Sequence, residues 1–475
     1  MSEISEMRKY IEAFAAFYSM NLSQLSERLG YRSKTSLIRM MDEPVRPKSA
    51  QDFRKRLLAN FQLSPKQIEE LDRALHIKIY GLENYMINQE LVRFIHSEHS
   101  IYPDDLKIQV LSKNSPHGVE YLTLPQLYQH KKDLKILILN CQFVHLYSQL
   151  RSLLLGGDVR VQQYLHGYKD TAHTISSITS VMSVCFSANY SVGFFDELVQ
   201  AENRSPFGLS MTDILLCTYY DENNVRCTDI ILFVTENLGI MSIRAPYESI
   251  QNPFLQSRLG KYYWIKNTPA ESNTHIAQII LSHAALANNS HHWSFKPDLF
   301  ISQVSENILH DAINAELFSR SEFENIKASF SKLACHSHLA RHHVFMIHKK
   351  RAMNHFAETG TIQSHPHFLK PFSPAQRLEI LDSLIREQDS NPYFHLLFLR
   401  DDNSVDDMEI RCYDRKGILV IPDSKYDKKY CEVFINNSEF TDAYKKFYMQ
   451  EMVMKLCLPE SASVSILKSL RNQIT

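Results

Sequence analysis

The spacing of apolar residues changes once along this chain, near residue 100, and that change limits the folds that the sequence can adopt. Before it, apolar residues recur at steps of three and four, as at Met7, Ile11 and Phe14, which is the pattern of an amphipathic helix. After it, short apolar runs such as 135–139 and 230–234 alternate with helical stretches. We therefore expect a multi-domain chain, with an all-α amino-terminal domain followed by a mixed α/β (α+β) carboxy-terminal region.

A chain of 475 residues has room for roughly two to four domains. We predict a helical domain over 1–75, a connecting helix and linker over 76–110, an α/β middle domain over 111–290 and an α+β domain over 291–475. The polar segment Asn288–His292 marks the last of these boundaries, because polar clusters between patterned segments are typical of loops.

Five helices are predicted in the first domain from their apolar spacing and capping residues. They cover residues 5–18, 22–29, 34–41, 50–61 and 64 onwards. Gly30 permits a tight left-handed turn after the second helix, and Ser33 is a candidate cap for the third. The fifth helix begins with the capping signature Ser64–Gln67. Its pattern continues towards Phe94, so we expect it to connect the first domain with the rest of the chain.

Beyond residue 100 the same criteria give further elements. Helical patterns cover 146–165, 170–200 and 303–357, and a second capping signature begins a helix at Ser373. Runs rich in β-branched and aromatic residues predict strands at 135–139, 230–234, 393–399, 408–413, 417–421 and 430–435, with further helices from Ser438 and from about 461.

Charge is unevenly distributed along a chain whose formal net charge is only −1. Between Arg28 and Arg56, nine basic residues stand against three acidic ones, which leaves a local excess of six positive charges. A near-neutral total argues against a protein that is coated with nucleic acid. A local basic segment is instead typical of a compact nucleic-acid site.

Within this basic segment lies the pattern of a scaffolding helix, a sharp turn and a second helix. Leu25, Leu29 and Leu37 are the apolar positions, Gly30 provides the turn, and residues 32–36 are polar. The second helix of such a pair can place its first residues against base edges in the major groove of DNA.

The stretch from Leu22 to Arg39, LSQLSERLGYRSKTSLIR, resembles the lambda-repressor-like (XRE) family of helix-turn-helix proteins. The resemblance covers about residues 5–75. Ser26 replaces the more usual alanine, and the turn at residues 31–33 is slightly longer than in the commonest members. The resemblance implies a compact helical domain that binds double-stranded operator DNA, commonly as a dimer on two half-sites.

The resemblance also implies which residues meet the DNA. Those at the start of the second helix would lie near phosphates, and those of the third helix would face the bases; the first group is Ser23 and Gln24, and the second is Arg32, Ser33, Lys34, Thr35, Ser36 and Arg39. By charge and position, Arg46, Lys48 and the run 54–56 suit contacts with the DNA backbone. The alternative interpretation is a small helical bundle that contacts proteins and carries a solvated basic face.

We therefore expect a cytoplasmic, sequence-specific DNA-binding transcriptional regulator that catalyses no reaction and holds no cofactor. The chain shows no signal peptide and no apolar run of the roughly 18 residues that cross a membrane. The carboxy-terminal region is expected to sense a small-molecule or peptide effector and to hold a homodimer. The segment Phe356–Gly360, followed by the helix from Ser373, resembles parts of some bacterial regulators of this type. Two alternatives stay open, namely an enzyme or nucleotide-dependent defence protein with a DNA-binding head, and a protein-binding scaffold.

Three further clusters have an ordinary structural interpretation beside a functional one. Cys335, His338 and His342 share one face of a predicted helix, but their spacing matches no standard zinc signature, so we predict packed and exposed histidines and no metal site. The basic run 349–351 predicts a solvated helix face. Aromatic residues of the middle region predict a core in preference to a ligand pocket; they are Tyr190, Phe194, Phe195, Tyr219, Tyr220, Tyr262, Tyr263 and Trp264.

Overall fold

The computed structural model divides the chain into two compact units, Met1–Val92 and Arg93–Thr475, which we call unit 1 and unit 2. The residues that it describes are 5–96, 106–111, 119–139, 141–142, 144–156, 159–166, 171–195, 214–235, 238–246, 261–262, 265–269, 275, 279, 282, 285–287, 290–337, 342–362, 369–422 and 431–474.

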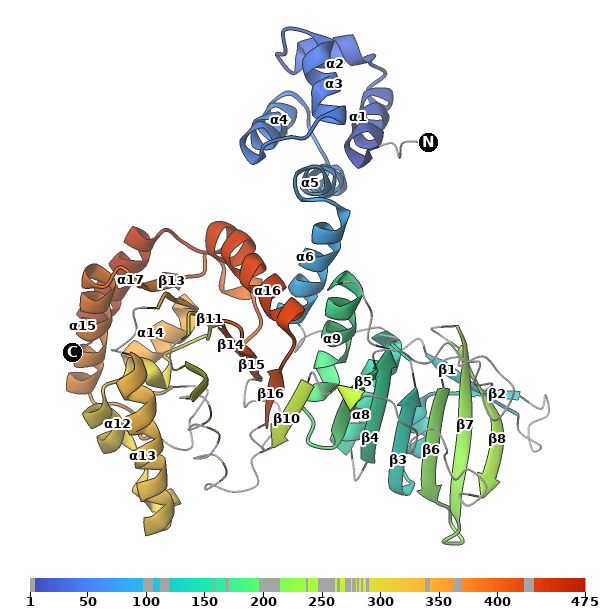
Figure 1. Ribbon diagram of the computed structural model, residues 1–475, viewed down its shortest axis with the longest axis vertical. Helices are drawn as coiled ribbons and strands as arrows, with labels where there is room; N and C mark the ends of the chain where they lie inside the picture. The colour runs from blue at the N-terminus through green and yellow to red at the C-terminus, as the bar shows by residue number, and fades with distance from the viewer. Residues whose placement is uncertain are drawn as a thin grey trace. The chain divides into compact units, whose positions relative to one another are not determined.

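Unit 1 is helical (Figure 1), and the predicted all-α amino-terminal region is confirmed. Its helices are α1 (Glu6–Phe17), α2 (Leu22–Arg28), α3 (Lys34–Asp42), α4 (Pro47–Asn60), α5 (Pro65–Tyr80) and α6 (Leu82–Ile95), of which the last residues belong to unit 2. The apolar positions that predict the helices also form their common core, to which Leu25, Leu37, Met41, Phe53 and Leu71 contribute.

Gly81 breaks the helix that the apolar pattern predicts to run on towards Phe94, so α5 and α6 are separate helices. Gly81 has a φ of 90° and a ψ of 160°, which is a conformation open to glycine and strained for other residues. Across the break, His76 Nε2 lies 3.1 Å from Asn88 Nδ2, and the rings of His76 and Tyr85 are 5.6 Å apart. The prediction of one continuous helix is therefore wrong. Gly81 is the sequence signal for the break, but the apolar spacing continues past it and does not show that the helix ends there.

Unit 2 contains a nine-stranded mixed sheet with the order β2-β1-β8-β7-β6-β3-β4-β5-β9. Its strands are β1 (Lys107–Leu111), β2 (Val119–Leu122), β3 (Lys132–Leu139), β4 (Val159–His166), β5 (Tyr190–Phe195), β6 (Ile214–Tyr220), β7 (Arg226–Thr235), β8 (Leu238–Pro246) and β9 (Lys261–Tyr262). Helices α7 (Leu124–Tyr128), α8 (Val144–Gly156) and α9 (Thr171–Cys185) connect successive strands. The neighbours β3, β4 and β5 run parallel.

The predicted helical stretches 146–165 and 170–200 are wrong in their second halves, where the structure has β4 and β5. Both strands pair with parallel neighbours that a helix separates from them in sequence. A buried parallel strand has no clear alternation of apolar and polar residues, so local spacing does not separate it from a helix. The predicted strands 135–139 and 230–234 lie within β3 and β7 and are confirmed.

A second, seven-stranded mixed sheet has the order β10-β16-β15-β14-β11-β12-β13. Its strands are β10 (Ile265–Pro269), β11 (His292–Phe295), β12 (Val344–His348), β13 (Phe394–Phe398), β14 (Glu409–Tyr413), β15 (Gly417–Ile421) and β16 (Cys431–Ile435). The helices of this part are α12 (Glu306–Ala312), α13 (Arg320–Ser337), α14 (Lys350–Thr359), α15 (Pro374–Ser390), α16 (Ser438–Phe447), a π-helical segment (Tyr448–Leu456) and α17 (Glu460–Gln473).

Residues 303–357 do not form the continuous helical region that their pattern predicts, because β12 lies between α13 and α14. This strand is enclosed by β11 and β13, with parallel pairing on both sides. The four strands predicted between 393 and 435 are confirmed as β13 to β16, and the capping signature at Ser373 starts α15.

The coarse prediction of a mixed α/β region after the helical one is confirmed, with one sheet built from strands within 107–262 and the other from strands within 265–435. The individual domain boundaries stay predictions.

Tyr190, Phe194 and Tyr219 are at most 2% exposed, as expected of core residues. Tyr263 and Trp264 lie outside the described residues. Within the described part of the chain, every helix is too short or too polar to traverse a lipid bilayer.

Candidate nucleic-acid interface

Helix α2 starts with a closed set of hydrogen bonds. Asn21 Oδ1 accepts from the backbone amides of Ser23 and Gln24, both at 3.0 Å, and Gln24 Oε1 accepts from the amide of Asn21 at 2.9 Å. Ser23 and Gln24 are exposed, as a role near phosphates requires. The capping bonds already use the backbone amides of Ser23 and Gln24 and the side-chain oxygen of Gln24. The donors left for a phosphate are the Ser23 hydroxyl and the Gln24 side-chain nitrogen.

The corner between α2 and α3 is fixed by an arginine from α4. Gly30 has a φ of 71°, the left-handed conformation that favours glycine. Arg56 Nη1 donates to the carbonyls of Leu29 at 2.9 Å and Gly30 at 3.1 Å, and the Arg56 guanidinium lies 5.0 Å from the centre of the Tyr31 ring. A cation at the carboxyl end of α2 satisfies carbonyls that the helix itself leaves without partners.

Helix α3 has one buried and one exposed face. Leu37, Met40 and Met41 are buried, as their spacing predicts. The polar residues Arg32, Ser33, Lys34, Thr35 and Arg39 are exposed, and Ser36 is half-buried. The residues that the sequence assigns to base contacts therefore lie on one accessible surface, which we call the α3 surface.

The amino-terminal end of α3 differs from that of α2. Ser33 occupies the capping position with extended backbone angles, yet its side chain makes no capping hydrogen bond. The prediction that Ser33 caps the helix is thus correct for its position and wrong for its side chain. The first amides of α3 point out of the helix end without a capping side chain, and a helix end of this kind carries partial positive charge.

Several basic side chains of the segment already have intramolecular partners. Arg54 forms a bidentate ion pair with Asp72 at 2.6 and 2.9 Å, and the Arg28 guanidinium lies 4.6 Å from the centre of the Phe61 ring. With Arg56 at the corner, three of the nine cations thus contribute to the fold. The contacts of Arg54 and Arg56 with a DNA backbone stay predictions, and both side chains would have to share their present partners.

Other basic residues around α3 are not committed in this way. Among the residues that the structure describes, no ion pair involves Arg32, Lys34, Arg46 or Lys48, and all four are exposed. Arg39 makes an exposed ion pair with Glu43 at 3.6 Å, a kind of pair that contributes about 0–1 kcal/mol and can open at little cost. The α3 surface therefore carries cations that can serve an anionic partner, and Arg46 and Lys48 add two more at the start of α4.

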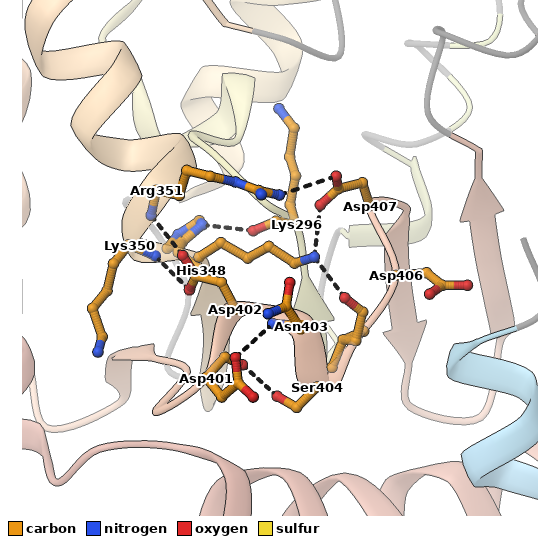
Figure 2. A network of polar contacts seen from close by, with 12 residues as sticks. Lys296, His348, Lys350, Arg351, Asp401, Asp402, Asn403, Ser404, Asp406 and Asp407 are labelled. Atoms are coloured by element: carbon orange, nitrogen blue, oxygen red, sulfur yellow. Dashed lines mark hydrogen bonds and ion pairs between the residues drawn. The ribbon is translucent and has the colours of Figure 1, made fainter. Parts of the chain in front are cut away.

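A second polar cluster lies in unit 2, at the carboxyl ends of the parallel strands β11, β12 and β13 (Figure 2). The run 349–351 belongs to it, and the prediction of a solvated face is wrong for Lys349, which is 3% exposed and pairs with Asp407 at 2.6 Å. Lys296 is fully buried beside Asp298. In the sequence, each of these lysines follows a short apolar run. The sequence does not show which carboxylate pairs with which lysine.

His348, at the centre of this cluster, has the hydrogen bonds of a structural residue. Its Nδ1 lies 3.0 Å from the carbonyl of Lys296, and its Nε2 lies 3.1 Å from Gln303 Nε2. A carbonyl can only accept, so Nδ1 carries the proton and Nε2 accepts from the glutamine. Burial lowers the pKa of His348 to about 4. A neutral imidazole with both nitrogens engaged is not available as a general base.

The predicted histidine and cysteine cluster cannot be placed in full. His338 and the side chain of Cys335 lie outside the described residues. Within the described ranges, no three histidine, cysteine, aspartate or glutamate side chains are grouped so that they could hold a metal ion.

Comparisons with known proteins add no argument about function. No protein-family model matches the chain, and no curated protein matches its sequence. Among solved structures, that of a phosphatidylserine synthase from Haemophilus influenzae Rd KW20 aligns with 80% of this chain and 97% of its own, at 10% identity and a TM-score of 0.25. A TM-score this low supports no conclusion about the fold or activity of the present chain.

Proposed function

We propose that this protein is a sequence-specific DNA-binding transcriptional regulator in which α2 and α3 act as a helix-turn-helix of the lambda-repressor-like type. The observation that carries the proposal is the α3 surface. A helix with three buried apolar residues presents its polar and basic side chains outward, next to cations that pair with no described carboxylate. An α-helix with its side chains is about 10–12 Å in diameter, which suits a major groove about 12 Å wide.

The side chains divide into two roles. Lys34 and Arg39 can donate to guanine O6 and N7, and Thr35 and Ser36 can contact either kind of base. Arg46 and Lys48, which flank the start of α4, suit contacts with phosphates, which provide affinity without sequence information. Unit 2 would hold a homodimer and respond to a small-molecule or peptide effector, so that two α3 helices reach half-sites about 34 Å apart.

The first prediction concerns base contacts. A preferred duplex is first selected from a random pool with the full-length protein, and its affinity is measured by fluorescence anisotropy. Lys34→Ala and Arg39→Ala should each weaken binding by roughly 5- to 150-fold, since one base contact is worth about 1–3 kcal/mol. Lys66→Ala, which removes an exposed cation near the start of α5, is the matched control and should bind as the unaltered protein does. Thermal unfolding shows that each variant is folded.

Two results would contradict the proposal. If both α3 variants bind the selected duplex as tightly as the control, α3 is not the recognition helix. If the unaltered protein binds no duplex at any salt concentration, the helical bundle is better explained as a protein-binding scaffold.

The second prediction concerns backbone contacts. The double variant Arg46→Ala, Lys48→Ala should lose affinity for the selected duplex and for random duplexes to the same extent, because both residues meet phosphates. The slope of log affinity against log salt concentration should become shallower by about one for each phosphate that the variant no longer neutralises. A loss restricted to the selected duplex, with the slope unchanged, would assign these residues to base recognition.

A further inference from the structure

The loop of residues 401–407, which we call the acidic loop, connects β13 with β14 and has the sequence DDNSVDD. It crosses the carboxyl edge of the parallel strands β11 to β13, beside the buried lysines of unit 2 (Figure 2). Of its four carboxylates, Asp401 is exposed, Asp402 and Asp407 are half-buried and Asp406 is buried. Three of them are fixed to three different parts of unit 2.

The first attachment is to the end of β12. Lys349 Nζ donates to the carbonyl of Val405 at 2.5 Å and pairs with Asp407 Oδ1 at 2.6 Å. Arg351 Nη2 lies 3.5 Å from the second oxygen of Asp407. Lys349 is buried and Asp407 is 20% exposed, so this ion pair is better shielded from solvent than a surface pair and holds the loop more firmly.

The second attachment is to the start of α14. The carboxylate of Asp402 accepts from the backbone amides of Lys350 at 2.9 Å and Arg351 at 2.7 Å. A carboxylate at this place satisfies two amides at the helix start and interacts favourably with the helix dipole. The attachment fixes the first half of the acidic loop through the backbone of the two residues that follow Lys349.

The third attachment is to the end of α6. The amide of Asp406 donates to the carbonyl of Ile95 at 3.1 Å, and Asp406 Oδ1 lies 3.3 Å from His96 Nδ1. In Figure 2, Asp406 points away from Asp402 and Asp407. The nearby Phe94 is fully buried, and its ring lies 5.1 Å from that of Phe440. The last residues of α6 are thus held in unit 2 by both apolar and polar contacts.

Successive residues of the acidic loop contact different parts of unit 2. The carbonyl of Val405 and the carboxylate of Asp407 face Lys349, whereas Asp406, between them, faces α6. Neighbouring Cα atoms are about 3.8 Å apart, so the segment cannot leave Lys349 without disturbing Asp406. We infer that the acidic loop couples the site of Lys349 to the end of α6, the helix that runs on from unit 1, and so regulates the DNA-binding unit. The inference rests on the proposed function only where it concerns DNA.

The coupling is tested by hydrogen exchange of the full-length protein, followed by mass spectrometry. Asp407→Asn removes the charge that holds Lys349, and amides at residues 93–96 should then exchange at least about tenfold faster, because local opening of the α6 end becomes easier. Asp382→Asn is the matched control, since it breaks an exposed pair with Arg471 at 2.7 Å and should leave these amides unchanged. Amides of β14 and β15 serve as the internal reference for global unfolding.

Coupling must act in both directions, which gives a second and milder variant. His96→Ala alters a residue that is 38% exposed and should leave unit 2 folded, yet amides at 405–408 should exchange several-fold faster. If α6 is unaffected by Asp407→Asn relative to the internal reference, or the acidic loop is unaffected by His96→Ala, the coupling does not exist.

The regulatory consequence has its own measurement. With the selected duplex, Asp407→Asn should change affinity by about fivefold or more, the usual size of an allosteric effect, while Asp382→Asn should not. Equal affinities, together with faster exchange, would overturn the regulatory role. A protein that binds no duplex at all would instead overturn the proposed function, and the exchange results would still decide the coupling.

Discussion

Lowering the pH from about 7.5 to about 4.5 is expected to remove several kcal/mol from the free energy of unfolding of unit 2. One fully buried histidine, His348, and one half-buried histidine, His292, are responsible. Burial lowers the pKa of His292 to about 4, with a smaller contribution from the nearby Arg411, and burial likewise lowers that of His348 to about 4, from an ordinary value of 6.5. His292 begins β11 and His348 ends β12. Because these strands are parallel, a fall in pH should weaken both ends of this part of the sheet.

The direction of this pH effect depends on whether the folded or the unfolded protein binds more protons. Between pH 6.5 and about 4 the unfolded chain protonates these histidines, whereas the folded protein keeps them neutral. Their contribution is therefore complete above pH 6.5 and is lost as the pH falls towards 4. A pKa that falls from 6.5 to about 4 corresponds to roughly 3 kcal/mol for each histidine.

Urea unfolding at several pH values, followed by tryptophan fluorescence, measures the effect. The two tryptophans of the chain, Trp264 and Trp293, both belong to unit 2, so the fluorescence reports on that unit. His348→Asn should be less stable at neutral pH but should lose about half of the pH dependence. His130→Asn, at an exposed position, should keep all of it. A stability that is constant from neutral pH to about 4.5 would show that the folded protein protonates these histidines as readily as the unfolded chain does.

Lys296→Met is expected to destabilise unit 2 by about 3–5 kcal/mol, the usual result of removing one partner from a buried ion pair. Lys296 Nζ lies 3.3 Å from Asp298 Oδ1, and the side chains are 0% and 1% exposed. The lysine also donates to the carbonyl of Leu299. Methionine fills a similar volume without a charge, so the variant leaves the Asp298 carboxylate in the interior without this cation.

The double variant Lys296→Met, Asp298→Asn separates charge from packing. It should recover at least about 1 kcal/mol relative to Lys296→Met, because the amide removes the buried charge. Arg471→Met breaks an exposed pair with Asp382, in which the side chains are 44% and 43% exposed, and should cost no more than about 1 kcal/mol. If Lys296→Met costs as little as Arg471→Met, the buried pair does not contribute to the stability of unit 2.

Several features of the candidate interface can be predicted from local sequence. The turn at Gly30, the inward positions of Leu37 and Met41 and the outward positions of Lys34 and Arg39 all follow from spacing over a few helical turns. The partners of the arginines do not follow from it. Arg54 meets Asp72 and Arg56 meets the carbonyls of α2 only because α4 packs beside both elements in the folded bundle.

The same limit explains the predictions that were wrong in unit 2. Strands β4, β5 and β12 are stabilised by parallel neighbours that lie in other parts of the sequence, and their apolar runs look locally like helices. Lys349 lies in a run of three cations that resembles a solvated face, and its burial depends on the carbonyl and carboxylate that the acidic loop supplies.

The amino-acid sequence by itself determined the all-α start, the change to mixed α/β structure near residue 100, the main helix caps and the strands between 393 and 435. Each of these depends on side-chain spacing or capping residues within a few positions. Only the tertiary structure decided the break at Gly81, the parallel strands, the burial of Lys296 and Lys349 and the attachment of α6 to the acidic loop. These features depend on contacts between distant residues or on a single backbone angle, and neither leaves a trace in local periodicity.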